Sequence, residues 1–412
     1  MPVDSKSSVK PITAIIEELK ATFPQGVRVD LGQSGAGASA AIRGLRHDSR
    51  KVSSGDAFFC IEGQKYDGNL FVKDAVDKGA SLVISEKAPP ADADINVPFV
   101  VVPDVRQALA AVSDYFFDRP SKRMRLIGVT GTNGKTTTTH MVEHIFQSQG
   151  TRVGLIGTLG ARWTHADAGR DYQDLKFTTP QASDLQELLN TMANDGVSHV
   201  AMEVSSHALA LKRVEKCEFA VACLTNVSQD HLDFHKTMEH YWKSKRILFE
   251  QLTAGSQTER AAVINLDDAL ANDFLKAVGK DVRAITYGWN ETADVRAVKA
   301  DFDFTGTRLE LATPYGALKL KLKLNGVFNV YNAMSALSIV LNEGVDKETA
   351  KEAIESFEGV AGRFEVVRLA QPEDGEIDEP LCLVDYAHTP DGLDNVLRAA
   401  RKLVPAGGKL IV

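Results

Sequence analysis

Residues 125–139 read RLIGVTGTNGKTTTT, and this stretch is the strongest indication of fold in the chain. An apolar run typical of a buried strand leads into a glycine-rich turn, and the turn leads into the start of a helix. Gly131 and Gly134 let backbone N–H groups face phosphates, Lys135 can reach the β- and γ-phosphates, and the Thr136 hydroxyl can ligate Mg²⁺. The stretch therefore predicts a phosphate loop at the end of a parallel strand.

The loop departs from the standard pattern at one position. Val129 stands where that pattern has a glycine, five residues before Gly134. The alternative is a glycine-rich turn with a surface lysine, and it is disfavoured because strand, loop and helix fall in register.

Strands and helices alternate on both sides of the loop. The expected strands are 125–129, 152–158, 199–204 and 220–227, and the expected helices are 137–149, 184–195 and 239–250. Continuous apolar strands in such an alternation predict an α/β fold with a mainly parallel sheet covered by helices on both faces. The run LKLKLKL at 318–324 alternates strictly, which predicts an antiparallel strand with one solvated face.

The 412 residues suggest about three domains. We expect a small α/β unit at 1–121, with helices near 12–23 and 70–78 and strands at 57–61 and 81–84. A central unit follows at 122–358. A third unit, at 359–412, has an expected strand at 381–385, a helix at 391–403 and a strand at 409–412. Such a βαβ start cannot close its own core, so we expect an incomplete Rossmann-like domain of a longer, C-terminally truncated protein.

Composition narrows the class of protein. The formal net charge is −8, which argues against a nucleic-acid partner held by bulk charge. The four cysteines form no C-x-x-C pair and lie in apolar runs, as expected for reduced, buried thiols in the cytoplasm. The N-terminus lacks the apolar segment of a secretion signal, and no stretch approaches the ~18 apolar residues of a membrane span. We expect a cytoplasmic protein without a membrane partner.

Polar residues follow two expected strands. Glu203 closes one strand, and Asp230 and His231 lie just beyond the next. The carboxyl ends of parallel strands meet at the ligand-binding edge of the sheet, where a carboxylate can ligate Mg²⁺. Lys245 follows on a helix, where by residue pattern alone it reads as an ordinary surface lysine and Lys243 is an equal candidate.

Several motifs in order carry a resemblance to a known family. They are TGTNGKTTT, TTP at 178–180, EVSSHAL at 203–209, TNVSQDHLDFH at 225–235, YWKSK at 241–245, GVFNVYNAMSA at 326–336, GRFE at 362–365 and VDYAHTPDGL at 384–393. Together they resemble the Mur ligases from about residue 40 to the end of the chain. The pattern is most similar to members that add the third residue to UDP-N-acetylmuramoyl-L-alanyl-D-glutamate.

The resemblance implies roles for individual residues. ATP would be bound by Gly131, Thr132, Asn133, Gly134, Lys135, Thr136, Thr137, Asn329, Asn332, Arg363 and Asp385. The uridine nucleotide would be bound by His47, Ser49, Gln64, Lys65 and Tyr66, and the muramoyl-dipeptide by Thr178, Thr179, Ser205 and Arg213. Lys245 would be carbamylated to N6-carboxylysine and would hold Mg²⁺ with Thr136, Glu203 and His231. The catalytic set would be Lys135, Glu203, His231 and Lys245.

The implied reaction forms an amide bond at the expense of ATP. The γ-carboxylate of D-glutamate would attack ATP to give an acyl phosphate, and the amine of a diamino acid would then expel phosphate. We favour meso-diaminopimelate over L-lysine as that diamino acid, and we expect a monomer. The alternatives are a folylpolyglutamate-synthetase-like ligase, a Mur-like scaffold subunit without catalysis, and a plain P-loop NTPase or kinase.

Overall fold

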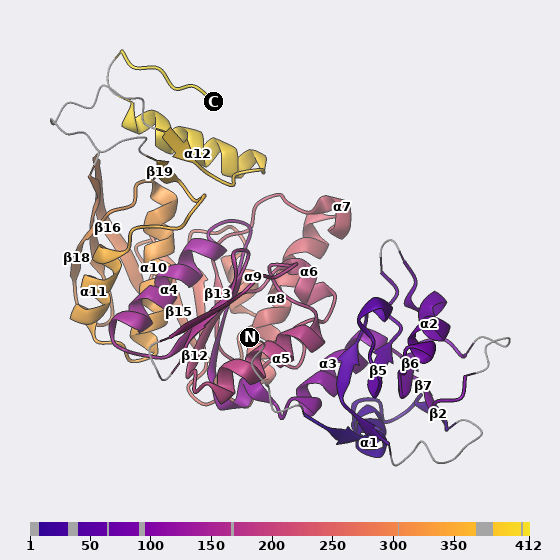
Figure 1. The fold of residues 1–412 in the computed structure, drawn as a ribbon. Helices are drawn as coiled ribbons and strands as arrows, with labels where there is room; N and C mark the ends of the chain where they lie inside the picture. The colour runs from indigo at the N-terminus through magenta and orange to yellow at the C-terminus, as the bar shows by residue number, and fades with distance from the viewer. Residues whose placement is uncertain are drawn as a thin grey trace. The chain divides into compact units, whose positions relative to one another are not determined.

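The computed structural model describes residues 8–31, 40–63, 66–89, 95–165, 169–303, 305–367, 382–404 and 407–412. The chain divides into two compact units, which are coloured along the sequence in Figure 1. The first unit holds Met1–Arg123, Pro180–Asp195 and Ala208–Cys217, and the second holds Met124–Thr179, Gly196–His207 and Glu218–Val412. The division into domains at 1–121, 122–358 and 359–412 stays a prediction.

The first unit is built on a five-stranded sheet in the order β2-β7-β6-β5-β4. Strands β4 to β7 are parallel and β2 is antiparallel to β7. Its strands are β1 (Lys10–Pro11), β2 (Arg28–Asp30), β3 (Ala41–Ile42), β4 (Gly44–Arg46), β5 (Asp56–Phe59), β6 (Leu82–Ser85) and β7 (Phe99–Val101). Its helices are α1 (Ile12–Thr22), α2 (Val72–Asp77), α3 (Val105–Phe116) and α5 (Ala182–Asn194), with short 3₁₀ turns at Ser49–Lys51, Gly68–Phe71 and Pro120–Arg123. The small α/β unit expected at the N-terminus is therefore present.

The second unit is built on an eleven-stranded sheet in the order β11-β10-β9-β12-β8-β13-β14-β15-β16-β17-β18. Strands β9 to β16 in this order pair in parallel, and both edges are antiparallel. The strands are β8 (Arg125–Thr130), β9 (Val153–Gly157), β10 (Gly160–Thr164), β11 (Arg170–Gln173), β12 (His199–Glu203), β13 (Phe219–Leu224), β14 (Ala261–Asn265), β15 (Arg283–Gly288), β16 (Val295–Asp303), β17 (Gly306–Ala312) and β18 (Leu318–Leu322). The predicted mainly parallel sheet is confirmed.

Helices cover both faces of this sheet. The helices of this unit are α4 (Lys135–Ser148), α6 (Ser206–Ala210), α7 (Leu232–His235), α8 (Met238–Ala254), α9 (Ala271–Leu275), α10 (Val327–Asn342), α11 (Lys347–Ser356) and α12 (Pro390–Leu403), of which α12 packs in a separate small core with Phe364. Ile127 and Val129 of β8 lie in one apolar core with residues of α4, α10 and α11. Gly128 between them faces the other way, where an added Cβ would lie 3.1 Å from Leu248 of α8. Successive strand residues point to opposite faces, so α8 covers the face away from α4.

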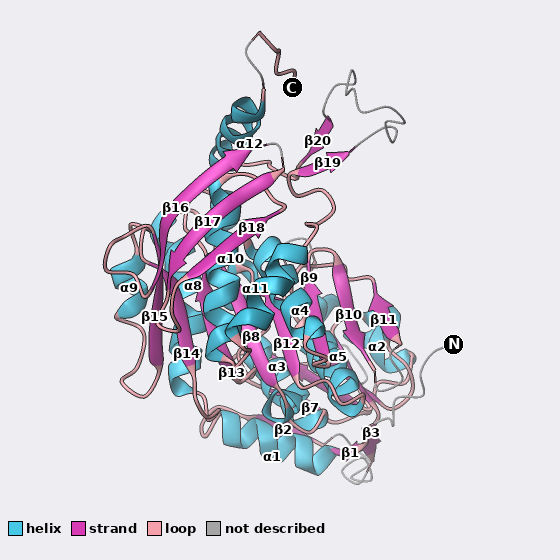
Figure 2. Ribbon diagram, turned by 90° about the vertical axis from the view of Figure 1, so that its left-hand side faces the viewer, coloured by secondary structure: helices cyan, strands magenta, loops and turns pink. Residues whose placement is uncertain are grey.

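The antiparallel edge follows its sequence pattern. Strands β16, β17 and β18 lie next to one another in Figure 2. Along Leu318–Leu322 the leucines are buried and the lysines exposed, as the strict alternation predicted.

The C-terminal part of the chain differs from the expectation at its last element. The predicted strand at 381–385 is present as β20 (Cys382–Val384), which pairs antiparallel with β19 (Glu365–Val367), and the predicted helix is α12. The predicted strand at 409–412 is wrong, because these residues pair with no strand among those that the structure describes. Ile411 and Val412 are almost fully exposed. An apolar run becomes a strand only where a neighbouring strand takes up its backbone hydrogen bonds.

The cysteine expectation holds for three of four residues. Cys60, Cys217 and Cys223 are buried free thiols, and burial raises the pKa of Cys60 to about 12. Cys382 is only half-buried. None of the helices in the described ranges is long and apolar enough to cross a membrane.

Candidate functional site

The phosphate loop lies between the end of β8 and the start of α4. Gly131 and Gly134 have φ angles of 148° and 88°, which side chains rarely adopt. An added Cβ at Gly131 would overlap the Thr225 hydroxyl, and one at Gly134 would overlap the Asn332 amide oxygen. Both glycines are thus required by backbone angle and by close approach.

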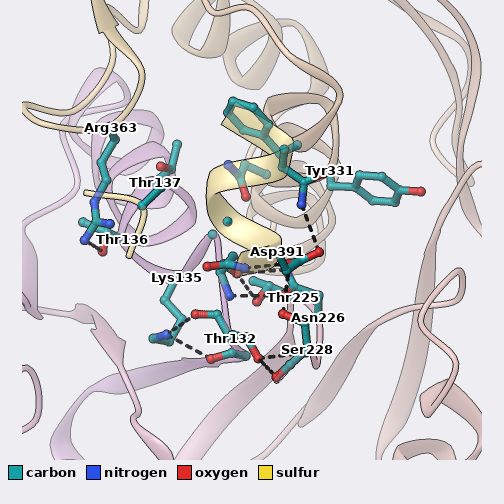
Figure 3. A pocket seen from close by; sticks show the side chains of 18 of the residues that line it. Thr132, Lys135, Thr136, Thr137, Thr225, Asn226, Ser228, Tyr331, Arg363 and Asp391 are labelled. Atoms are coloured by element: carbon teal, nitrogen blue, oxygen red, sulfur yellow. Dashed lines mark hydrogen bonds between the residues drawn. The ribbon is translucent and has the colours of Figure 1, made fainter. Parts of the chain in front are cut away.

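Residues at the end of β13 hold the loop in shape (Figure 3). The Asn133 N–H donates to Asn226 Oδ1 at 3.0 Å, and Asn226 Nδ2 donates to the Asn133 carbonyl at 3.0 Å. The Thr225 hydroxyl donates to the same carbonyl at 2.6 Å. One amide side chain therefore satisfies both polar groups of Asn133, as a neighbouring strand would.

Lys135 points back into the loop. Its ammonium donates to the carbonyls of Gly131 at 2.9 Å and Thr132 at 2.8 Å. Burial lowers the pKa of Lys135, and Glu203 acts in the opposite direction. Lys135 is thus held by neutral carbonyls, which an anionic phosphate can replace as the stronger acceptor.

Glu203 is fully buried at the end of β12. Its Oε2 accepts from the Thr136 hydroxyl at 3.0 Å, and its Oε1 accepts from the Thr158 N–H at 2.8 Å. Arg363 donates to the same Thr136 hydroxyl at 3.1 Å, as drawn in Figure 3. The structure thus brings together three predicted site residues, Thr136, Glu203 and Arg363.

Lys245 is buried on α8, so its interpretation as an ordinary surface lysine is wrong. Its side chain is 1 % exposed, and Nζ donates to the Gly131 carbonyl at 2.7 Å. Burial, assisted by the charge of Lys135, lowers the pKa of Lys245 far below its ordinary value. Lys243 is exposed and pairs with Glu239 at 2.5 Å. Burial therefore separates two lysines that the residue pattern left equal.

His231 lies beyond β13 in the left-handed conformation, with φ 51°. Its Nε2 is 3.3 Å from Asp230 Oδ2, and its side chain is 40 % exposed. Burial lowers the pKa of His231, while Asp230 raises it. A neutral imidazole can offer a lone pair to a metal ion.

One cavity of about 630 Å³ joins these groups. The predicted residues that line it are Gly131, Thr132, Asn133, Gly134, Lys135, Thr136, Thr137, Thr178, Glu203, Ser205, His231, Lys245, Asn329, Asn332, Arg363 and Asp385. Thr179 does not line the cavity. It is fully buried, and its hydroxyl donates to the Glu203 carbonyl at 2.9 Å. Asp385 accepts from the N–H groups of Phe364 and Ala387, both at 2.7 Å.

The remaining predicted residues belong to the other compact unit. His47 shares a 3.3 Å hydrogen bond with Ser183, Ser49 is buried, and Tyr66 is 72 % exposed. Burial lowers the pKa of Arg213 to about 10. Gln64 and Lys65 lie outside the described residues.

Comparison with known proteins now decides the family. Residues 129–340 match the Mur ligase middle domain, and residues 41–117 match the Mur ligase family, catalytic domain. The UDP-N-acetylmuramoyl-L-alanyl-D-glutamate–2,6-diaminopimelate ligase of Bacillus licheniformis is 41% identical over 373 residues, which are 90% of this chain and 72% of that enzyme. The chain belongs to the Mur ligase family. The enzyme of that name from Listeria monocytogenes is 41% identical over 86% of this chain and 69% of its own length.

Solved structures of Mur ligases agree with this fold. A UDP-N-acetylmuramoyl-L-alanyl-D-glutamate–2,6-diaminopimelate ligase superposes with a TM-score of 0.74 and 30% identity, over 94% of this chain and 74% of that one. A MurF ligase from Thermotoga maritima, in complex with ADP, superposes with a TM-score of 0.57 at 20% identity, over 86% of this chain and 74% of that one. The latter likeness shows the fold alone.

Sequence reasoning missed several residues of this Mur ligase site. Thr158, Asn226, Tyr241 and Asp391 all line the cavity. Thr158 directly follows β9 and Asn226 is the second residue after β13, so the rule that located Glu203 could also have found them. Tyr241 and Asp391 lie on helices, within the motifs YWKSK and VDYAHTPDGL, which could have drawn attention to them.

Proposed function

We propose that this chain is an ATP-dependent ligase that joins 2,6-diaminopimelate to UDP-N-acetylmuramoyl-L-alanyl-D-glutamate. The observation that carries the proposal is the cavity in which a phosphate loop, a buried carboxylate and a buried lysine meet. The identity to enzymes of this activity supports the choice of substrate. We also propose that the reaction takes place in the cytoplasm, which the substrates ATP and a UDP-linked precursor support, and that the enzyme is a monomer.

Phosphate binding follows from the loop. Backbone N–H groups at the start of α4 and the Lys135 ammonium meet the phosphates of ATP. The carboxylate of D-glutamate and the triphosphate repel one another, so cationic and dipolar groups fixed in advance lower the barrier to their reaction. The carboxylate attacks the γ-phosphorus and ADP leaves; the amine of diaminopimelate then attacks the acyl carbon and phosphate leaves.

The site also fits Mg²⁺. Hydroxyl and carboxylate oxygens are ligands that Mg²⁺ prefers, and Thr136 and Glu203 already share a 3.0 Å hydrogen bond at the loop. His231 and a carbamylated Lys245 would complete the set. When bound, Mg²⁺ supplies positive charge beside the phosphates.

Carbamylation of Lys245 is consistent with its surroundings. Only an uncharged amine attacks CO₂, forming an N–C bond and releasing a proton. Burial lowers the pKa of Lys245 well below its ordinary value and so raises the uncharged fraction of its amine, whereas Lys243 is exposed and paired with a carboxylate. A carbamate at Lys245 is an anionic oxygen ligand, which suits a hard cation.

Residues from the C-terminal part of the chain help to enclose the nucleotide. Arg363 reaches Thr136, and Asp391 accepts hydrogen bonds from Asn133 at 3.1 Å and Ser228 at 3.0 Å (Figure 3). These contacts hold the C-terminal part of the chain against the loop. An acyl phosphate hydrolyses in open water, so this enclosure protects it.

The proposal is tested by assaying phosphate release with UDP-N-acetylmuramoyl-L-alanyl-D-glutamate, ATP and either diaminopimelate or L-lysine. We expect release with diaminopimelate, and its loss in Lys135→Ala at an unchanged melting temperature. Normal ligation by Lys135→Ala contradicts the role of the loop, and a preference for L-lysine contradicts the choice of amino acid. ¹³C-bicarbonate labelling followed by NMR should show a carbamate that disappears in Lys245→Ala but not in Lys243→Ala.

A further inference from the structure

The carboxylate of Glu203 occupies space that a glycine leaves open. Strands β9 and β12 pair in parallel, with Met202 opposite Ile156, so that Glu203 adjoins Gly157. An added Cβ at Gly157 would lie 3.0 Å from Cδ of Glu203 and closer still to its Oε1. The end of β9 is therefore shaped to receive this carboxylate.

Thr158, the next residue, donates hydrogen bonds to both oxygens of that carboxylate. Its backbone N–H donates to Oε1 at 2.8 Å, and its hydroxyl donates to Oε2 at 3.2 Å. Glu203 is fully buried, so its orientation depends on these bonds and on the Thr136 hydroxyl. A buried carboxylate without such partners is strongly disfavoured.

The Thr158 hydroxyl also contacts Thr178, which the family resemblance assigns to the muramoyl-dipeptide. Its oxygen lies 3.2 Å from the hydroxyl oxygen of Thr178. A threonine hydroxyl has one proton, and an ionised carboxylate can only accept hydrogen bonds, so the Thr158 hydroxyl donates its hydrogen bond to Glu203. The oxygen of the Thr158 hydroxyl can then accept a hydrogen bond from the Thr178 hydroxyl. Two hydroxyls thus form a directed chain from Thr178 to Glu203.

We infer that Thr158 is a positioning residue that fixes the Glu203 carboxylate for a divalent cation and links that cation to the substrate bound at Thr178. This inference rests on the proposed function for the identity of the substrate. The role of Thr158 in cation binding does not depend on that function. Partners that orient a metal ligand change metal affinity by ~10–100-fold when they are removed. A ligand at Thr178 and a cation at Glu203 then influence one another's affinity, and this influence is reciprocal.

The first test titrates Mn²⁺ alone into the protein in bicarbonate buffer and follows free Mn²⁺ by EPR. Thr158→Val keeps the backbone N–H and the shape but removes the hydroxyl, and we expect ~10–100-fold weaker Mn²⁺ binding. Thr158→Ser restores the hydroxyl and binds within about threefold of the wild type. Thr191→Val is the matched control, because the Thr191 hydroxyl donates to Glu187 within α5 and does not line the cavity.

Wild-type Mn²⁺ affinity in Thr158→Val overturns the inference. So does an equal loss in Thr158→Val and Thr158→Ser, since the hydroxyl would then have no part in binding. Melting temperatures of all variants show whether each one is folded. Because no ligation is measured, these outcomes do not depend on the proposed activity.

The second test measures the Kd of UDP-N-acetylmuramoyl-L-alanyl-D-glutamate by calorimetry, with and without Mn²⁺. We expect Mn²⁺ to change this Kd at least fivefold in the wild type and less than twofold in Thr158→Val, with Thr158→Ser like the wild type. An equal effect of Mn²⁺ in the wild type and Thr158→Val overturns the link to Thr178. Failure of the wild type to bind this ligand contradicts the proposed substrate instead, and the first test still decides the role of Thr158.

Discussion

Gly157→Ala should disable the site without altering any of its polar groups. The added Cβ would lie 3.0 Å from Cδ and 3.1 Å from Cγ of Glu203. Carbon atoms pack at about 3.5–4.0 Å, so the side chain of Glu203 must retreat by about 0.5–1 Å. That shift breaks the 2.8 Å bond from the Thr158 N–H and moves the carboxylate away from Thr136.

The size of the effect follows from this displacement. A misplacement of about 1 Å can cost about 100-fold in rate, which corresponds to about 2.7 kcal/mol of transition-state stabilisation. The overpacked site should also lose about 1–3 kcal/mol of unfolding free energy. We expect kcat/KM for phosphate release to fall about 100-fold, and Mn²⁺ binding to weaken with it.

A second glycine-to-alanine substitution serves as a control. It separates the displacement of Glu203 from the general effect of replacing a glycine with alanine. An added Cβ at Gly255, at the end of α8, would meet its nearest atoms at an ordinary 3.4 Å, and the φ of −69° suits alanine. Gly255→Ala should therefore keep wild-type kinetics and change stability by less than about 0.5 kcal/mol. Wild-type kcat/KM and Mn²⁺ affinity in Gly157→Ala would refute the reasoning.

Three further predictions concern the loop, acid stability and the far end of the sheet. Asn226→Ala removes both hydrogen bonds between the Asn226 side chain and Asn133. The loss of about 1.4 kcal/mol should lower the ATP affinity measured by calorimetry about tenfold. Wild-type affinity would contradict the role of Asn226 in holding the loop. Burial lowers the pKa of His235 to about 4, so the unfolded chain binds its proton more tightly than the folded one. The contribution of His235 to the free energy of unfolding should therefore be complete above about pH 6.5 and should fall by at most about 2–3 kcal/mol toward pH 4, as measured by urea titrations. The variant His235→Gln should lack this component of the pH dependence. Arg125 donates twice to Glu343, both at 2.7 Å, so Arg125→Ala should cost about 3 kcal/mol of unfolding free energy while leaving Mn²⁺ binding unchanged below the melting transition. A loss under 1 kcal/mol would show that this partly exposed pair contributes as little as a surface pair does.

Features that depend on local chemistry could be predicted from the sequence. The phosphate loop was predictable because its glycines, Lys135 and Thr136 act within a few residues of one another. The parallel sheet was predictable because strands buried on both faces are apolar throughout. The short C-terminal run at 409–412 carries the same apolar signal but pairs with no strand in the described part of the chain, so its composition alone was misleading.

Which polar residues act together depends on the folding of distant segments onto one another. Lys243 and Lys245 are two residues apart on α8, about 200° around the helix, and packing of one face against the sheet buries Lys245 alone. Thr158 and Glu203 are separated by 45 residues in sequence, yet β9 and β12 are neighbours because the sheet order departs from the chain order. Strand order depends on which apolar faces pack together across the whole domain, and no local pattern of residues records it.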